Sequence, residues 1–332
     1  MKKRLKFGIM AVLASFSLQS QTLKATASGS VVTNSTAGNN STFVGTSAGA
    51  VTTGASNTFV GYQAGSSNTT GLGNTMLGTN AGSYNITGIS NTFIGNGAGY
   101  NNTGSYNTLI GTACGSNTTS GGGNSFLGHG AGDANTTGTN NTYLGFLAGN
   151  TATGSYNIFV GQGAGKSGSG NDLLFVDNSN TQNPLIWGSF VNGSRQLKFH
   201  GKVGIGGEYN TAFGSFPTTA GGVSVANYKL FVKGGILTEE VRVNTVSGWA
   251  DYVFKDDYHL RPLSEVEQFI TDNGHLPNVP SACEVESDGI ELANMAKIQQ
   301  EKIEELTLYL IQQQKEIETL KAQMNLLLEK KQ

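Results

Sequence analysis

A short sequence recurs eight times, in phase, between residues 40 and 170. Each copy approximates Asn-Thr-Φ-Φ-Gly-x-x-Ala-Gly, where Φ is apolar, followed by a spacer rich in Asn, Thr, Ser and Gly. Successive copies lie 16 or 17 residues apart, too short for a helical hairpin but suited to one coil of a parallel β-solenoid, or β-roll. We therefore expect stacked coils, each with two short strands and two turns.

The turns of these coils are assigned to the glycines, because glycine adopts positive φ angles without a steric penalty. The first glycines of the copies are Gly45, Gly61, Gly78, Gly95, Gly111, Gly128, Gly145 and Gly161. An asparagine column also runs through the copies, and we expect its side chains to stack and hydrogen-bond along the solenoid axis. Its members are Asn57, Asn74, Asn91, Asn107, Asn124, Asn141 and Asn157.

The two apolar positions of each copy are adjacent, so they point to opposite faces of a strand. One column is Phe43, Phe59, Met76, Phe93, Leu109, Phe126, Tyr143 and Phe159. The other is Val44, Val60, Leu77, Ile94, Ile110, Leu127, Leu144 and Val160. Since both faces are apolar, we expect another copy of the chain to cover the outer one. A cover from within the chain is the competing interpretation.

With these motifs, residues 40–170 resemble the head repeats of trimeric autotransporter adhesins, which are of the type Asn-Ser-Φ-x-Φ-Gly-x-x-Ala. The resemblance implies a left-handed parallel β-roll that packs as a homotrimer. The present repeats differ in their longer period and in their second glycine, which runs from Gly49 to Gly165.

The N-terminal residues 1–27 have the pattern of a signal peptide. A basic segment of Lys2, Lys3, Arg4 and Lys6 precedes an apolar stretch from Phe7 to Leu18, which is shorter than a membrane span. This pattern predicts a secreted or cell-surface protein; a short buried helix is the alternative. The repeat region is then bounded at 28–170.

Residues 171–247 predict a β-rich connector, because short apolar runs alternate with Asn and Gly turns. Residues 248–297 predict a small α+β unit. In it, Ser264 and Glu267 form a capping-box pattern that opens a helix through Asp272, and Asn273-Gly274 ends this helix. The following sequence HLPNVPS is expected to be extended, and a long helix is expected from Leu292.

Residues 298–332 carry a heptad pattern and predict a trimeric coiled coil, with a polar layer at Gln313. A membrane-surface helix is the alternative, which the many glutamates disfavour. The expected trimerisation residues are Ile303, Leu306, Leu310, Gln313, Ile317, Leu320, Met324 and Leu327.

From about Trp249 onward, the chain resembles the C-terminal domains of secreted bacterial tail-fibre-like proteins. These are similar to the endosialidase-type intramolecular chaperones of phage tail spikes. Self-cleaving chaperones begin with a Ser-Asp pair and carry a Lys five residues after the serine. Here Ala250-Asp251 stands at that place, with Lys255 five residues on. The resemblance therefore implies a non-cleaving domain, because an alanine has no nucleophile.

The charge distribution disfavours enzymatic chemistry in the repeats. The net charge is −2, and Asp133 is the one formally charged side chain between Ser28 and Gly165. That region cannot supply the carboxylate pair of a glycan hydrolase within one chain, and it has no basic footprint for nucleic acid. The four histidines lack metal-site spacing. We expect no catalytic, metal or cofactor-binding residues.

These patterns predict a mainly β, homotrimeric fibre with a structural or adhesive role. The alternative is a glycan-binding receptor-recognition fibre of the phage tail-fibre type, either with or without an enzymatic site between chains. Five tyrosines of the repeats could stack on sugar rings: Tyr62, Tyr84, Tyr100, Tyr106 and Tyr156. The partners would then be surface glycans or cell-surface proteins. Ice binding by the threonine column is a weaker interpretation.

Overall fold

The computed structural model describes residues 40–206, 216–220, 223–244 and 248–330. The proposed signal peptide lies outside these ranges. The chain divides into two compact units, Met1–Gly201 and Lys202–Gln332, which we describe separately.

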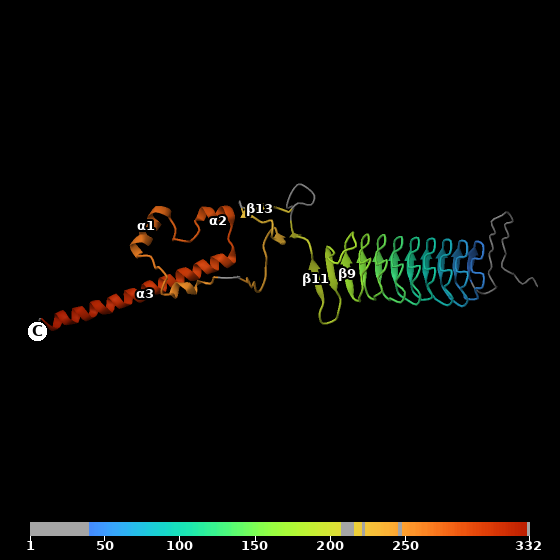
Figure 1. Ribbon diagram of the computed structural model, residues 1–332, viewed down its shortest axis with the longest axis horizontal. Helices are drawn as coiled ribbons and strands as arrows, with labels where there is room; N and C mark the ends of the chain where they lie inside the picture. Colours follow the sequence, from blue (N-terminus) through green and yellow to red (C-terminus); the bar gives the residue numbers. More distant parts are fainter. Residues whose placement is uncertain (1–39, 207–215, 221–222, 245–247, 331–332) are drawn as a thin grey trace, which may run out of the picture. The chain divides into compact units, whose positions relative to one another are not determined.

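The first unit is a parallel β-solenoid, drawn from blue to green in Figure 1. Each coil contributes one three-residue strand, and each strand pairs in parallel with the next, so that equivalent repeat positions lie opposite one another. The strands are β1 (Thr42–Val44), β2 (Thr58–Val60), β3 (Thr75–Leu77), β4 (Thr92–Ile94), β5 (Thr108–Ile110), β6 (Ser125–Leu127), β7 (Thr142–Leu144) and β8 (Ile158–Val160). The predicted fold of the repeats is confirmed.

The expectation of two strands per coil is wrong, because each coil has only one. Left-handed residues follow the strand too closely for a second one to form; in the second coil these are Gly61, Gln63 and Gly65, at φ 139°, 54° and 57°. The backbone outside the strands still bonds to the next coil, as in Thr69 N to Ile86 O at 2.8 Å. The stacking therefore continues around the coil without a second regular strand.

The core of the solenoid is the first apolar column together with the small residue three positions after each turn glycine. Phe59, Phe93 and Ala98 are completely buried, as is Cys114, which replaces an alanine in this column. Neighbouring rings stack, with Phe126 and Tyr143 at 4.5 Å between centroids. The second column faces outward in this chain, as the alternation predicted: Leu77, Leu127 and Leu144 are about half exposed.

The asparagine column forms the predicted ladder along the inside of the coils. Asn107 shows the pattern: its backbone N–H donates to Asn91 Oδ1 at 2.9 Å, and its Oδ1 accepts from Asn124 N at 2.9 Å. Its amide nitrogen donates to Gly121 O at 2.9 Å. The side chain of each such asparagine thus satisfies backbone groups of the following coil, and its own backbone N–H is satisfied by the asparagine of the preceding coil. An unpaired backbone group would be costly at this buried place.

The connector begins as a ninth rung of the stack. Strand β9 (Leu173–Val176) pairs in parallel with β8, and β10 (Ile186–Ser189) and β11 (Gln196–Phe199) continue the sheet as an antiparallel meander. Phe175 extends the buried column, and Leu173 and Trp187 pack against it. This meander therefore closes the C-terminal end of the solenoid core.

The second unit combines small sheets with helices. Strand β12 (Val203–Ile205) pairs in parallel with β15 (Leu230–Val232), and β13 (Thr219–Ala220) pairs with β14 (Val223–Ser224). The helices are η1 (Ala250–Phe254), α1 (Leu263–Asn273), α2 (Ala282–Asp288) and α3 (Leu292–Glu329), the long helix of Figure 1. In the described part of 248–297 the regular elements are helices, so the strands of this unit come earlier in the chain.

Two local expectations in this unit are wrong. Helix α1 begins at Leu263 after Pro262, with no side-chain cap, so Ser264 lies inside the first turn instead of at the cap. The capping box is at Ser281 and Glu284, where it opens α2. The sequence HLPNVPS is not extended throughout, because Asn278 is left-handed at φ 62° in a turn closed by Val279 N and Leu276 O. The expected end of α1 is confirmed, with Gly274 as its left-handed cap.

Candidate functional site

The outer face of the solenoid sheet carries two exposed columns, which we call the outer sheet face. The aliphatic column lies beside the threonine column, whose members Thr58, Thr75 and Thr108 are exposed. In the last coil Ile158 replaces the threonine, so this end of the face is more apolar. Next to this face, His129 and Phe146 stack at 5.3 Å between ring centroids and are both exposed.

The turn glycines allow the coils to approach one another closely. Gly61 has φ 139°, and a Cβ on it would lie 2.3 Å from the carbonyl oxygen of Gly78 in the next coil. The same contact recurs at every first glycine from Gly45 to Gly145, with the next glycine's oxygen 2.2–2.4 Å away. These residues shape the stack and carry no side chain for chemistry.

The five tyrosines do not converge on one place. Tyr62 follows a turn glycine, whereas Tyr106 and Tyr156 occupy a left-handed position before the strand, at φ 63° and 61°. Only Tyr84 and Tyr100 contact one another among the five, edge to face with ring centroids 5.0 Å apart. The hydrogen bond with Tyr84 raises the pKa of Tyr100.

Helix α3 has two chemically different faces. The seven apolar residues of its heptad seam are 45–64% exposed in the single chain: Ile303, Leu306, Leu310, Ile317, Leu320, Met324 and Leu327. On the opposite side of the first turns, Glu301 and Glu304 are buried, and η1 packs against this helix. Ala250 and Val253 of η1 are fully buried, on one face of that short helix.

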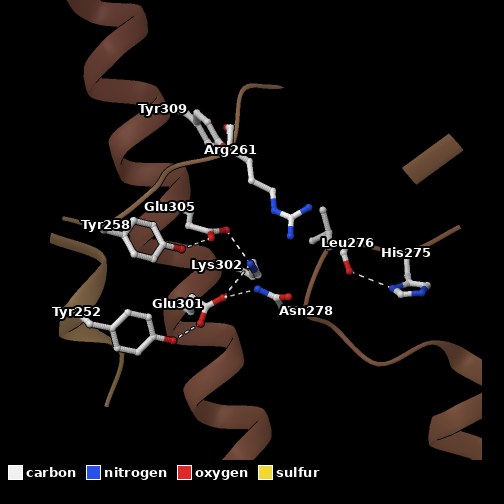
Figure 2. Close-up of polar contacts among 10 residues, drawn as sticks. All are labelled: Tyr252, Tyr258, Arg261, His275, Leu276, Asn278, Glu301, Lys302, Glu305 and Tyr309. Atoms are coloured by element: carbon white, nitrogen blue, oxygen red, sulfur yellow. Dashed lines mark hydrogen bonds and ion pairs between the residues drawn. The ribbon is translucent and has the colours of Figure 1, made fainter. Parts of the chain in front are cut away.

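A polar network joins η1 and the segment after it to α3 (Figure 2). Tyr252 donates its hydroxyl hydrogen to Glu301, and Tyr258 donates to Glu305 one turn further along. Lys302 lies between the two carboxylates, with Nζ at 3.0 Å from Glu301 and 2.8 Å from Glu305. We call these five residues the tyrosine–glutamate network.

The network perturbs the ionisation of its members. The hydrogen bond to Glu301 raises the pKa of Tyr252 to about 12, and burial with the hydrogen bond to Glu305 raises the pKa of Tyr258. Burial alone would raise the pKa of Glu301, but the hydrogen bonds from Tyr252 and Lys302 outweigh it and hold this pKa below the usual value. Likewise, burial opposes the charge of Lys302, yet Glu305 and Glu301 raise its pKa. All four shifts favour the protonation states that bind one another.

The turn before α2 contributes to the same region. Asn278 of this turn donates to Glu301 at 3.5 Å (Figure 2). The segment before α1 is also bound to α3, because Tyr309 donates to the backbone oxygen of Arg261 at 2.6 Å. A small cavity of about 110 Å³ lies beside the network. It is lined by Arg261, Lys302, Glu305 and Tyr309, by apolar side chains of α1 and of the turn that follows it, and by the seam residue Leu306. These contacts tie the loop segments to the first turns of α3.

Sequence reasoning missed two features. A second column of buried asparagines lies seven residues after the turn glycines, and that spacing was visible in the sequence; its members are Asn68, Asn85, Asn102 and Asn135. The tyrosine–glutamate network gave no such signal, because Tyr252 and Glu301 are 49 residues apart.

The part of the chain that the structure describes contains no group of three or more His, Cys, Asp or Glu residues that could hold a metal ion. No helix within it is long and apolar enough to cross a membrane. No family model, no curated protein and no solved structure matches this chain.

Proposed function

We propose that this chain is a fibrous protein that assembles as a homotrimer, with a structural or adhesive role at the cell surface or outside the cell. In this proposal the solenoid is the rod and α3 holds the chains in register. The signal-peptide pattern of residues 1–27 supports export.

The observation that carries the proposal is the exposed seam of α3. Seven large apolar side chains recur along it at heptad spacing and are 45–64% exposed, while the opposite face of the first turns is already covered by η1. A stripe of this length in water is unfavourable, and the same stripe on sister helices is its natural cover. The tyrosine–glutamate network keeps η1 on the back of the helix and so leaves the seam accessible.

The outer sheet face supports the same proposal. Its aliphatic column remains partly or largely exposed from coil to coil, including Leu77, Leu127 and Leu144. Contiguous apolar surface of this kind is typical of protein–protein contacts. Sister solenoids in register would bury this column along its whole length.

Light scattering of the full chain tests the proposal. The wild type is expected to have the mass of a trimer, and the double variant Leu310→Lys/Ile317→Lys is expected to be monomeric or aggregated, because it places charges in the seam. Ala322→Lys, on the exposed face of the helix away from the seam, is the matched control and should remain trimeric. A monodisperse wild-type monomer at micromolar concentration would refute the assembly, as would a seam variant that keeps the trimer mass.

We also propose that the C-terminal unit remains attached to the rod. Ala250 has no nucleophile and is buried, whereas Lys255, the residue after η1, is exposed, so the lysine is not enclosed together with position 250. Restoring the serine should therefore not restore cleavage. Mass spectrometry of Ala250→Ser is expected to show the intact chain; a fragment beginning near residue 250 would overturn this and support the alignment with self-cleaving chaperones.

A further inference from the structure

The contact between Tyr84 and Tyr100 lies at one end of a row of side chains at equivalent positions of four neighbouring coils. Tyr84 is 48% exposed, and its ring meets that of Tyr100 edge to face in the next coil. Tyr84 is exposed and Tyr100 is partly exposed, and the pair presents both an apolar ring face and hydroxyl groups. No other two of the five repeat tyrosines make such a pair.

Planar polar groups continue the row. Asn101 Nδ2 donates to Asn117 Oδ1 at 3.1 Å, and Asn117 Nδ2 donates to Asp133 Oδ1 at 3.3 Å. Ser116 also donates to Asp133 Oδ1. Ser116 and Asn117 both donate to Oδ1 of Asp133, so among the described residues its Oδ2 is left to accept from a ligand. The side-chain amides of Asn101 and Asn117 each keep a second N–H that can donate to a ligand. We call Tyr84, Tyr100, Asn101, Ser116, Asn117 and Asp133 the polar strip.

Backbone hydrogen bonds fix the spacing of the polar strip. Tyr84 N donates to Tyr100 O at 2.9 Å, Asn101 N to Ser116 O at 2.8 Å, and Asn117 N to Asp133 O at 3.0 Å. Successive side chains therefore stand one coil apart, at about the 4.8 Å separation of paired strands. The scaffold holds these groups in place before any ligand arrives, which reduces the entropy lost on binding.

The polar strip lies beyond the turn that follows the strand, and its residues do not belong to the outer sheet face. In the fourth coil, Gly95 and Gly99 turn the chain with φ 134° and 58° between strand β4 and Tyr100. Sister chains packed on the outer sheet face would therefore leave the strip open to a ligand.

We propose that the polar strip binds a glycan chain of pyranose rings that carries no acidic groups. The Tyr84–Tyr100 pair offers an apolar surface for the C–H face of one ring. The amides of Asn101 and Asn117 offer donors and acceptors for ring hydroxyls on the adjoining coils, and Asp133 accepts from a hydroxyl or an amino group. This inference rests on the proposed adhesive role and gives it a ligand class and a location.

The charge of the polar strip decides between glycan classes. Asp133 is the one formally charged side chain of the polar strip, so no cation within the strip neutralises a carboxylate or sulfate on a ligand. The next basic residue of the chain, Lys166, stands at the equivalent position two coils further on, beyond Asn150. Acidic glycans and nucleic acids would bring further negative charge against Asp133. Neutral or amino sugars meet no such repulsion.

Binding of the full chain to immobilised oligosaccharides tests the inference. The probes are neutral cello-, manno- and chito-oligosaccharides, with oligogalacturonate and sialyl-lactose as acidic counterparts. We expect binding to at least one neutral probe and none to the acidic ones. Tyr84→Ala/Tyr100→Ala should weaken that binding by about tenfold or more, because it removes the aromatic surface.

Two further variants sharpen the test. Tyr106→Ala/Tyr156→Ala removes two tyrosines outside the polar strip, both more exposed than Tyr84, and should bind as the wild type does. Asp133→Asn keeps an acceptor oxygen for Ser116 and Asn117, and it should reduce the discrimination against acidic probes. Circular dichroism on each variant checks that the solenoid is folded.

The inference is overturned if the folded wild type binds no neutral probe, prefers an acidic one, or binds equally well without the two ring side chains. Light scattering on the same samples separates this outcome from the assembly proposal. A trimer that binds no glycan would refute the polar strip alone, whereas a glycan-binding monomer would refute the trimer alone.

Discussion

Tyr252 in η1 donates a hydrogen bond to Glu301 in α3, 49 residues further along the chain. Glu301 is only 8% exposed, so few waters can replace this donor. The bond therefore links the position of η1 to the first turns of α3, opposite the seam through which we propose that the chains assemble.

Replacing Tyr252 with Phe should destabilise the second unit without changing the solenoid. The variant keeps the ring but removes the donor to Glu301, at a cost of about 1–3 kcal/mol in the free energy of unfolding. Hydrogen exchange should show faster exchange in residues 250–254. Tyr106→Phe, which changes a 64% exposed tyrosine, is the control and should leave exchange and unfolding unchanged.

The tyrosine–glutamate network should make the second unit sensitive to alkali. The pKa values of Tyr252, Tyr258 and Lys302 are raised in the folded state, so their contribution is complete below the unfolded values of about 10 and is lost as the pH rises through the folded values, about 12 for Tyr252. Thermal unfolding of this unit should move to lower temperature across that window. Tyr252→Phe/Tyr258→Phe should flatten the change; an identical alkaline profile would contradict the assignment.

The same network should weaken in acid. The pKa of Glu301 is lowered in the folded state, so its contribution is present above the unfolded value of about 4.3 and disappears as the pH falls through the lower folded value. Glu301→Gln should remove this part of the acid dependence. Unfolding curves of both proteins, measured from neutral pH to strong acid, give the comparison.

The turn glycines differ in how tightly the next coil lies against them. An alanine at Gly78 would place Cβ 2.4 Å from the backbone oxygen of Gly95, whereas an alanine at Gly97 would meet nothing within 4 Å. Both positions have positive φ, 138° and 65°. Gly97→Ala should therefore cost about 1–2 kcal/mol of strain alone, and Gly78→Ala should cost more, on the order of 4 kcal/mol, or prevent folding. Urea unfolding of the two variants measures the difference; equal losses would show that the coils separate easily.

Each asparagine of the ladder should contribute to the free energy of unfolding of the solenoid. Asn107→Ala leaves the backbone N–H of Asn124 and the carbonyl of Gly121 without their partners, at about 1–3 kcal/mol for each buried group. The exposed Asn96 provides the control, because its replacement by Ala should change the free energy of unfolding by less than about 0.5 kcal/mol. Comparable effects at the two sites would contradict a structural ladder.

The solenoid could be predicted because its information is local and repeated. A side chain such as Phe59 needs only the equivalent residue of the next coil, and eight copies in phase show that requirement directly. The number of strands per coil was harder to predict, because it depends on which residues after each strand adopt positive φ angles, as those near Gly61 do. Gln63 does so although it is not a glycine, and its sequence gives no sign of this.

The second unit was less predictable because its contacts are distant in sequence. Ser264 and Ser281 both precede a glutamate by three residues, yet only Ser281 stands at a helix start. At the first of these sites Pro262, with its fixed φ, takes the cap position itself, two residues too early for Ser264 to cap the helix. The tyrosine–glutamate network joins residues that no periodicity connects.

In the asparagine ladder each rung bonds to the next in the same way, with distances of 2.9–3.0 Å from Asn57 to Leu173. An inserted or deleted rung would therefore meet the same partners above and below. Duplication or loss of one repeat in the gene would change the length of the solenoid by one coil of 16 or 17 residues. The sequences on either side of the repeats would not need to change. Length is thus a property that evolution can alter here independently of the surface each rung displays.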